Sequence, residues 1–196
     1  MKKRKETELA MPSPEVIESE LNRVRYKTRY GRVLRSTVYA LITVAAIAVL
    51  IATLWMPVLQ TYGSSMTPTL EDGNIVISLK TAEPEIGDVI AFYYNNRILV
   101  KRVIAASGDW VNILEDGTVF VNDVELQEPY LTEKAFGDCD IELPYQVPES
   151  RIFVMGDHRS VSVDSRNTAV GCVAEEQIVG RLVFRLWPLD VIGAIE

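Results

Sequence analysis

The sequence predicts a mainly β protein: an antiparallel β-domain preceded by one N-terminal transmembrane helix. One apolar run of about 22 residues, 38–59, is the only segment long enough to cross a bilayer. Many short β-branched segments separated by turn signals follow it, with almost no helical pattern between them. We therefore expect a basic cytosolic segment at 1–35, a transmembrane anchor at 36–60 and an extracytoplasmic β-domain at 61–196.

Charge is distributed unevenly along the chain, and this distribution predicts how the apolar segment is oriented. The formal net charge is −7. Residues 1–35 hold ten Lys/Arg against five Glu, whereas the remainder holds ten Lys/Arg against twenty-two Asp/Glu. Since basic flanks stay on the cytoplasmic side, we expect a protein of the cell membrane whose N-terminus is cytoplasmic and whose acidic domain is extracytoplasmic. Basic residues beside a bilayer need no nucleic-acid partner, so we expect the lipid bilayer as a partner and no nucleic acid.

The apolar segment has one rival interpretation, a cleavable signal peptide. The segment is too long for this, begins too far from the N-terminus, and is followed by no Ala-x-Ala site. We therefore expect an uncleaved anchor with Trp55 and Pro57 near its outer end. Before the anchor, Ser13-Pro14-Glu15 is typical of a helix start. The residues from there to Arg35 are predicted to form either a basic helix on the membrane surface or a partly ordered tail.

The β-domain is predicted from strands that alternate with turns. The signals Asn95-Asn96 and Glu115-Asp116-Gly117 predict hairpins. Residues 175–178 resemble a short helical turn, and the strand pattern weakens over 127–150, where prolines interrupt it. The expected strands are 74–79, 89–94, 97–105, 110–114, 118–121, 124–126, 151–155 and 179–187.

A short hydroxyl-bearing stretch, Tyr62-Gly63-Ser64-Ser65-Met66, follows the apolar segment almost directly. A linker that leaves a membrane would be expected to carry charge, yet nothing charged lies between Arg35 and Glu71. We therefore interpret the stretch as a small, stiff loop held at the membrane surface. Within it, Ser65 is predicted to be a nucleophile.

A lysine is the predicted activator of that serine. His158 is the only histidine, so a Ser-His-Asp triad would have to use it. A neutral lysine amine can also activate a serine when burial lowers its pKa from about 10.4 towards the working pH. Lys101 lies in an apolar strand, on the same face as Leu99 and Val103. It is either a desolvated base or an edge-strand lysine that points outward and blocks aggregation.

Four short motifs occur in order after the anchor. Together with the stretch Glu128-Pro129-Tyr130-Leu131, they are the residues on which a similarity to a known protein family depends. The motifs are Ser65-Met66-x-Pro68-Thr69-Leu70, Gly87-Asp88-Val89-Ile90, Val100-Lys101-Arg102-Val103 and Gly156-Asp157-x-Arg159-x-x-Ser162-x-Asp164-Ser165-Arg166. From Tyr62 to the C-terminus the chain resembles the type I signal peptidases (bacterial leader peptidases), a family of Ser/Lys membrane proteases. The resemblance implies an antiparallel β-domain of the signal-peptidase type beside the membrane. It also implies an enzyme that removes signal peptides from secretory preproteins, cutting after small residues at positions −1 and −3.

The same resemblance implies a role for individual residues. Ser65 is the nucleophile, Lys101 is the general base, and the Ser162 hydroxyl helps to orient the lysine amine. The expected structural ion-pair partners near the site are Asp157, Asp164, Arg166 and Arg102. A carboxylate touching Lys101 would raise its pKa, the wrong direction for a base, so we predict that these carboxylates engage arginines. No cofactor and no metal are implied.

Two positions depart from the family pattern. Where many members have Asn, this chain has His158, which we interpret as a substituted loop residue. Where some members carry a serine that helps to form the oxyanion hole, this chain has Gly63. The backbone N–H of Ser65 must then carry more of the stabilisation, and Ser64 is a candidate for a compensating donor. Loss of one oxyanion donor costs about 3 kcal/mol.

The two cysteines, Cys139 and Cys172, both lie in the predicted external domain. A disulfide is compatible with that location, but the spacing does not decide it. The chain has no Cys-x-x-Cys pair and a single histidine, so no zinc site is expected.

Three rival functions are considered beside the signal peptidase, and the last of them is set aside. A specialised relative would process one class of cargo, such as pilus or conjugation proteins, and the motifs do not separate it from a general enzyme. A non-catalytic, membrane-tethered β-domain would have no need of Ser65 or Lys101. A cytosolic self-cleaving repressor would need a DNA-binding helix pair where this chain has an anchor.

Overall fold

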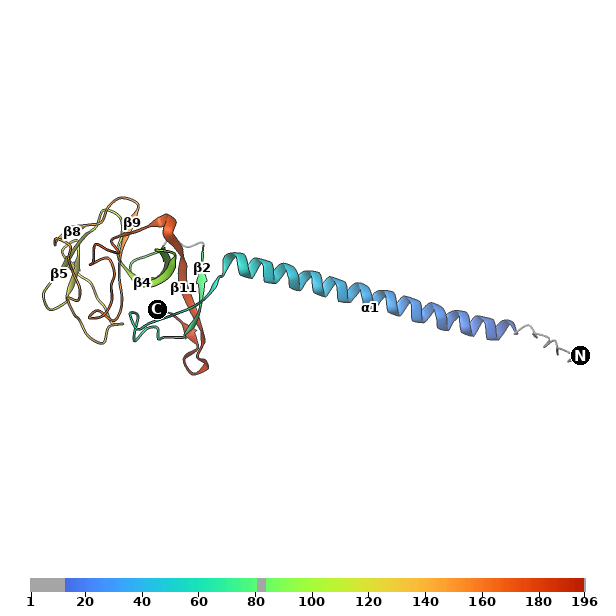
Figure 1. Ribbon diagram of the computed structural model, residues 1–196. Helices are drawn as coiled ribbons and strands as arrows, with labels where there is room; N and C mark the ends of the chain where they lie inside the picture. Colours follow the sequence, from blue (N-terminus) through green and yellow to red (C-terminus); the bar gives the residue numbers. More distant parts are fainter. Residues whose placement is uncertain (1–12, 81–83, 196) are drawn as a thin grey trace, which may run out of the picture. The chain divides into compact units, whose positions relative to one another are not determined.

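The computed structural model of the protein describes residues 13–80 and 84–195. The chain divides into two compact units at Leu50/Ile51. Figure 1 shows one long helix in the N-terminal part of the chain and an all-β arrangement in the C-terminal part.

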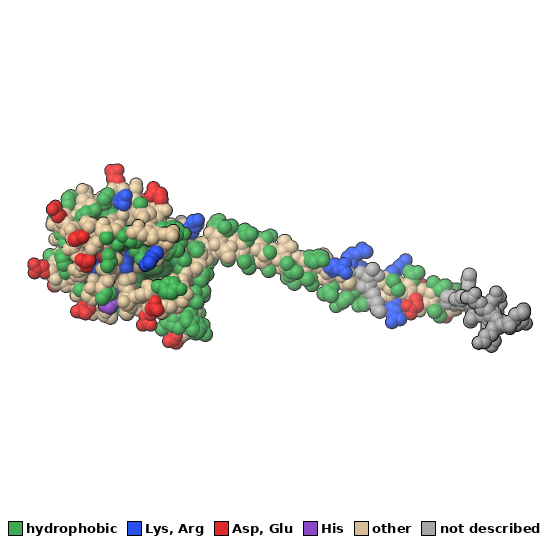
Figure 2. Space-filling view, in the orientation of Figure 1, with side chains coloured by type: hydrophobic (Ala, Val, Ile, Leu, Met, Phe, Trp, Pro, Cys, Tyr) green, Lys and Arg blue, Asp and Glu red, His purple; other side chains and the backbone are tan. Residues whose placement is uncertain are grey.

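The helix α1 runs from Pro14 to Trp55. It begins as predicted: the Ser13 carbonyl accepts hydrogen bonds from the amides of Val16 and Ile17. The helix continues through Arg35 without a break, so the interpretation as a partly ordered tail is wrong for residues 14–35; residues 1–12 lie outside the described part. By length and composition α1 is able to cross a membrane. Figure 2 shows its Lys and Arg side chains gathered towards the N-terminal half, with apolar side chains covering the remainder.

The outer end of the predicted anchor needs correction. The helix ends at Trp55, and β1, Val58–Gln60, pairs antiparallel with β2, Ile75–Leu79. Pro57 separates the two elements and cannot donate a backbone hydrogen bond to continue the helix. Its carbonyl instead accepts a hydrogen bond from the Ser78 amide. The last residues of the predicted span, 58–60, therefore belong to the β-sheet.

The larger sheet has eight strands, all paired antiparallel. Its order is β1-β2-β11-β3-β4-β9-β10, with β12 paired to β11. The strand β4 therefore lies between β3 and β9 in the interior of the sheet. The remaining strands of this sheet are β3 (Val89–Tyr94), β4 (Arg97–Ala105), β9 (Arg151–Met155), β10 (Val173–Ala174), β11 (Ile178–Trp187) and β12 (Gly193–Ala194).

A second, four-stranded sheet has the order β7-β6-β5-β8. Its strands are β5 (Trp110–Ile113), β6 (Val119–Val121), β7 (Val124–Glu125) and β8 (Tyr145–Gln146). Val111 and Val119 of this sheet pack in one buried cluster with Ile104 of β4 and Phe153 of β9. Two short 3₁₀ turns, Glu175–Gln177 and Leu189–Val191, complete the described unit. The predicted fold class, mainly antiparallel β after one long apolar helix, is confirmed.

Both predicted hairpins are present, and their turn residues explain them. Asn95 and Asn96 have φ of 42° and 62°, the left-handed conformation that a two-residue turn between β3 and β4 requires. Gly117, between β5 and β6, has a φ of 86° and packs so closely on the backbone of Ala135 that any Cβ would overlap it. Glycine is therefore the residue that fits the second turn.

Candidate active site

The loop between β1 and β2 carries Ser65 and is closed by hydrogen bonds at its base. The Thr61 amide donates to the Asn74 carbonyl (2.9 Å), and the Gly73 amide donates to the Thr61 carbonyl (2.9 Å). The Gly63 amide donates to the Asp72 carboxylate (2.7 Å), and Gly63 has a φ of 85°. These hydrogen bonds close the loop, and Ser65 lies half-buried within it.

The Lys101 amine reaches this serine from β4. Lys101 Nζ lies 2.7 Å from Ser65 Oγ, although the two residues are 36 positions apart in the sequence. Lys101 is only 3% exposed, and its strand is paired with β3 along this segment. The interpretation of Lys101 as an outward-pointing edge lysine is therefore wrong.

Burial determines the protonation of this amine. Desolvation is the largest influence on Lys101 and lowers its pKa from 10.5 to about 8. The Asp164 and Asp157 carboxylates oppose this shift, and the Arg166 guanidinium acts in the same direction as burial. The neutral amine is thus well populated near pH 8, and it lies within proton-transfer distance of a hydroxyl group.

Two carboxylates near the amine are held by arginines, as the sequence predicts. Asp157 accepts two hydrogen bonds from Arg102, at 2.9 and 2.7 Å. Asp164 accepts hydrogen bonds from Arg166 at 2.8 and 2.9 Å and one from the Gly156 amide at 2.9 Å. All four charged side chains are fully buried. Pairing with guanidinium groups uses up carboxylate oxygens that would otherwise favour a charged lysine.

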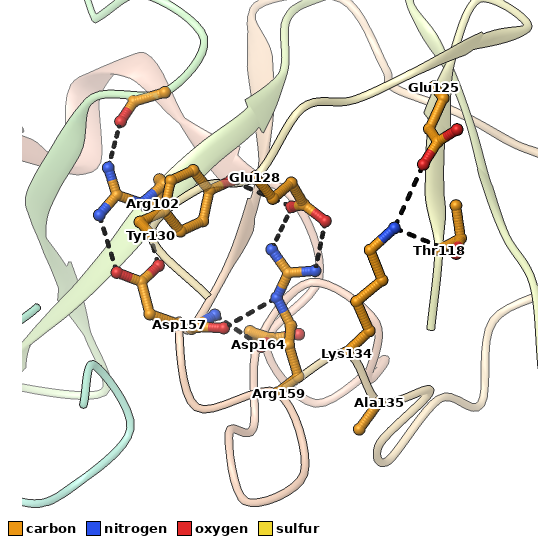
Figure 3. Close-up of polar contacts among 12 residues, drawn as sticks. Arg102, Thr118, Glu125, Glu128, Tyr130, Lys134, Ala135, Asp157, Arg159 and Asp164 are labelled. Carbon is orange, nitrogen blue, oxygen red and sulfur yellow. Dashed lines mark hydrogen bonds and ion pairs between the residues drawn. The ribbon is translucent and has the colours of Figure 1, made fainter. Parts of the chain in front are cut away.

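Glu128, Tyr130 and Arg159 join the same network, and the sequence assigned none of them a role. Arg159 forms a two-pronged ion pair with Glu128, and the Tyr130 ring lies on Arg102, 3.8 Å from ring centre to guanidinium carbon (Figure 3). The Tyr130 hydroxyl donates to Glu128 (3.0 Å), and burial followed by the Glu128 charge raises its pKa. The stretch 128–131 therefore contacts Arg102, the residue that follows Lys101.

Ser162, the predicted lysine-orienting residue, is buried, and Gly156 lies close to both Ser162 and Ser65. Its hydroxyl makes no hydrogen bond within the described part of the chain, and so none to Lys101. A Cβ at Gly156 would overlap both the Ser162 hydroxyl and the Ser65 carbonyl. Glycine at 156 therefore permits the chain leaving β9 to pass between these two serines, and the role of Ser162 stays a prediction.

The two departures from the family pattern lie beside Ser65. The His158 amide donates to the Ser65 carbonyl (3.1 Å), and its ring Nδ1 lies 3.2 Å from the Ser64 carbonyl. The Ser65 amide donates to none of the described residues, and neither does the exposed Ser64 hydroxyl. The loop around Gly63 therefore keeps at least one backbone donor available beside the nucleophile candidate.

A cleft of about 570 Å³ opens at the Ser65 hydroxyl. One wall is the segment Leu59–Met66 and the other is the first half of β4, from Arg97 to Val100. Met66 is buried and lies close to Val100 in one apolar cluster. The cleft therefore has apolar side chains beside Ser65, whereas Arg97 adds a charged group to its lining.

The two cysteines are unpaired in the structure. Cys172 is buried, and Cys139 is half-buried. Burial raises the pKa of both thiols.

Comparison with known proteins gives consistent matches. The family model described as signal peptidase, peptidase S26, matches residues 34–187. Thylakoidal processing peptidase 1 of Arabidopsis thaliana is 37% identical over 142 residues, which are 64% of this chain and 40% of that protein. Signal peptidase IB of Staphylococcus aureus is 40% identical over 148 residues, 65% of this chain and 76% of that protein. The chain thus spans well under half of the plant relative. Among solved structures, a signal peptidase I from Enterococcus faecalis is 30% identical, with a TM-score of 0.45, and covers 52% of this chain and 97% of its own.

Proposed function

The chain belongs to the signal peptidase family, peptidase S26, and on that premise we propose that it removes signal peptides from secreted preproteins with a Ser65/Lys101 dyad. The observation that carries the proposal is the 2.7 Å approach of a buried lysine amine to the Ser65 hydroxyl. A binding module has no use for a buried, partly neutral lysine beside a serine, because burying an amine costs free energy. The non-catalytic alternative is therefore disfavoured.

The proposed reaction has two steps. Neutral Lys101 takes the proton of Ser65 as the hydroxyl oxygen attacks the scissile carbonyl, and the lysine then gives that proton to the leaving amine. In the second step Lys101 takes a proton from water as the water oxygen attacks the ester carbonyl, and it gives that proton to Ser65 Oγ as the ester bond breaks. The available Ser65 amide is the proposed donor to the oxyanion in both steps. Ser162 is proposed to limit the movement of the lysine side chain, with Asp157, Asp164, Arg102 and Arg166 as a rigid frame.

The cleft suggests how small residues are selected. Met66 and Val100 bound the cleft beside Ser65, and these apolar side chains are proposed to limit the size of the side chain accepted at position −1. A preprotein bound there would place its small −1 and −3 side chains on this face. We propose secretory preproteins with a small residue at each of these positions as the substrates.

The helix suggests where the reaction occurs. We propose a single-pass topology with a basic cytosolic segment at 1–35, an anchor within α1 and an extracytoplasmic catalytic domain from residue 61. Signal peptides are themselves apolar and enter the same bilayer, so anchoring raises the effective concentration of the substrate. The lipid bilayer is thus a proposed partner.

The pH dependence of cleavage should follow Lys101. Because the lowered pKa of about 8 belongs to a base that acts in its neutral form, kcat/KM should fall about tenfold per pH unit below pH 8. Above pH 8 it should level off. The measurement is kcat/KM for one peptide substrate from pH 5.5 to 10 in detergent. A pH dependence that disappears in His158→Ala would contradict the assignment and favour the histidine.

The function itself is tested by incubating the detergent-solubilised full chain with a preprotein that carries an Ala-x-Ala site. Mass spectrometry of the products should locate a single cut after the second alanine. The His158→Ala variant should cut at a rate within about threefold of wild type. The hydrogen bond from residue 158 to Ser65 comes from the backbone amide, which alanine keeps. If general preproteins stay intact while one cargo class is cut, the specialised relative replaces the proposal. If nothing is cut, the catalytic proposal fails.

A further inference from the structure

One edge of β4 is open next to the Ser65 cleft. The strand pairs with β3 over 97–102, but β9 pairs only with its end, from Arg102 onward, and no other described strand covers the rest. The Val103 amide donates to the Asp88 carbonyl on the β3 side (2.8 Å). Since alternate residues of an antiparallel strand direct their backbone groups to the same neighbour, Ile98 and Val100 direct theirs to the open edge. An extended polypeptide can add a strand there.

A second cavity, of about 480 Å³, lies on the other face of this edge. Arg97 and Leu99 line both cavities, whereas Ile98 and Val100 line only the Ser65 cleft. Val100 packs against the apolar cluster that contains Met66, whereas Leu99 packs against a different cluster that contains Ile90 and Phe92. Since side chains on a strand alternate between faces, the second cavity lies on the Leu99 face of β4, opposite Met66. Its remaining walls are Tyr94, Asn95, Val163 and Val170.

A hydrogen bond holds the lining of the second cavity in place, yet side chains of that lining remain exposed. The Tyr94 hydroxyl donates to the Ala169 carbonyl (2.6 Å), which fastens the β3–β4 hairpin to the loop that carries Val163. Val163 is nevertheless 48% exposed. Arg97 is also exposed and makes no ion pair with any described residue, so its charge faces the cavities unneutralised. An apolar wall next to an unpaired cation suits a ligand with both apolar and acidic groups.

We propose that the second cavity is a specificity subsite for the even-numbered residues upstream of the cleavage site. This rests on the proposed function. A substrate strand that directs its −1 and −3 side chains to the Ser65 face directs −2 and −4 to the opposite face. If the substrate strand runs from Arg97 towards Lys101, its −2 side chain lies against Leu99 and Val163. The −4 side chain, about 6.6 Å further along, then lies beside Arg97.

The subsite therefore selects two properties of the substrate. At −2 it favours a mid-sized apolar side chain over glycine, because the cavity offers Leu99, Val163 and Val170 as partners. At −4 it favours Glu over Lys, because Arg97 is the unpaired charge there. Only the −4 preference should weaken when salt is raised, since the −2 preference does not depend on charge.

The test uses the full chain in detergent and peptides with alanine fixed at −1 and −3. Wild type should cut a −2 Leu peptide with about tenfold higher kcat/KM than a −2 Gly peptide, and a −4 Glu peptide about fivefold better than a −4 Lys peptide. Val163→Trp, which fills the cavity, should bring the Leu/Gly ratio close to one. The matched control is Val161→Trp, on the same loop and 53% exposed but outside the cavity lining, which should keep the wild-type ratio. Arg97→Gln should abolish the Glu/Lys preference and leave the Leu/Gly ratio intact.

Each other outcome contradicts the inference. If kcat/KM of wild type is the same whichever residue occupies −2 or −4, the proposed subsite is wrong while the proposed function stands. If Val163→Trp alters selection at +1 or +2 instead, the cavity binds the downstream side and the assignment is overturned. If wild type cuts neither these peptides nor a preprotein with an Ala-x-Ala site, the proposed function and the inference fail together.

Discussion

Replacing Lys101 with methionine is expected to abolish cleavage while leaving the protein folded. Methionine keeps most of the apolar stem but removes the amine that lies 2.7 Å from Ser65 Oγ. Loss of a general base costs about 10²–10⁴-fold, and here the same group also protonates the leaving amine, so we expect a loss of at least about 10³-fold in kcat/KM. Ser65→Ala should be equally inactive, since it removes the attacking oxygen.

Folding should survive this substitution because the buried amine does not stabilise the protein. A lysine whose pKa falls on folding binds fewer protons in the folded state, so its penalty is complete below about pH 8 and fades towards pH 10.5. Lys101→Met removes that penalty, and the Tm at pH 7 should be equal to or above that of wild type. Lys101→Arg should be inactive as well, because a guanidinium stays charged at every working pH.

The matched control for Lys101 is Lys134→Met. Lys134 is exposed and pairs with Glu125 away from Ser65, so its loss should change kcat/KM by less than about twofold. The measurement is kcat/KM on one preprotein, with thermal unfolding of each variant in the same detergent. If Lys101→Met retains a tenth of wild-type activity, another group activates the serine.

Breaking the buried pair of Arg102 and Asp157 is expected to give the largest loss of stability. Arg102 and Asp157 are 1% and 2% exposed. Arg102 also donates to the Gly87 carbonyl (2.7 Å) and to Thr69 (3.2 Å) and lies under the Tyr130 ring. Arg102→Met would leave a buried carboxylate without its counter-charge, so the free energy of unfolding should fall by about 3–5 kcal/mol.

A double-mutant cycle distinguishes this pair from ordinary packing. The double variant Arg102→Met with Asp157→Leu buries no unpaired charge, so it should recover part of the stability that each single change loses. The control is Glu125→Gln, which breaks an ion pair whose side chains are 40% and 48% exposed and should cost less than about 1 kcal/mol. The free energies come from denaturant unfolding of the full chain. Equal losses for the exposed and the buried pair would contradict the account.

Local patterns made much of the fold predictable. The two hairpins follow from residues that tolerate positive φ, and the strand β4 follows from its apolar, partly β-branched residues on either side of Lys101-Arg102. A lysine among apolar strand residues is costly to bury unless it is neutral or paired, which made Lys101 a candidate base. Its assignment to Ser65 came from the resemblance to the signal peptidases. The residues alone still left the outward-pointing alternative open, since exposure depends on which strands pair with β4.

Long-range pairing accounts for the features that local patterns do not predict. Val58–Gln60 continue an apolar run, and nothing local separates them from the helix; only their pairing with β2 makes them a strand. Glu128 and Arg159 lie 31 positions apart, and charged residues are usually exposed, so their buried pairing leaves no local sign. The second cavity likewise depends on a loop that folds back against the β3–β4 hairpin.

The most direct test of the Ser65/Lys101 dyad is to trap the nucleophile covalently. A peptide with an Ala-x-Ala sequence ending in a phosphonate diester, added to the detergent-solubilised chain, should form a stable phosphonyl ester that peptide mapping places on Ser65. The rate of adduct formation should rise with pH through about 8 and drop at least about 10²-fold in Lys101→Met. An adduct on another residue, or one that forms on Ser65 at the same rate without Lys101, would contradict the dyad.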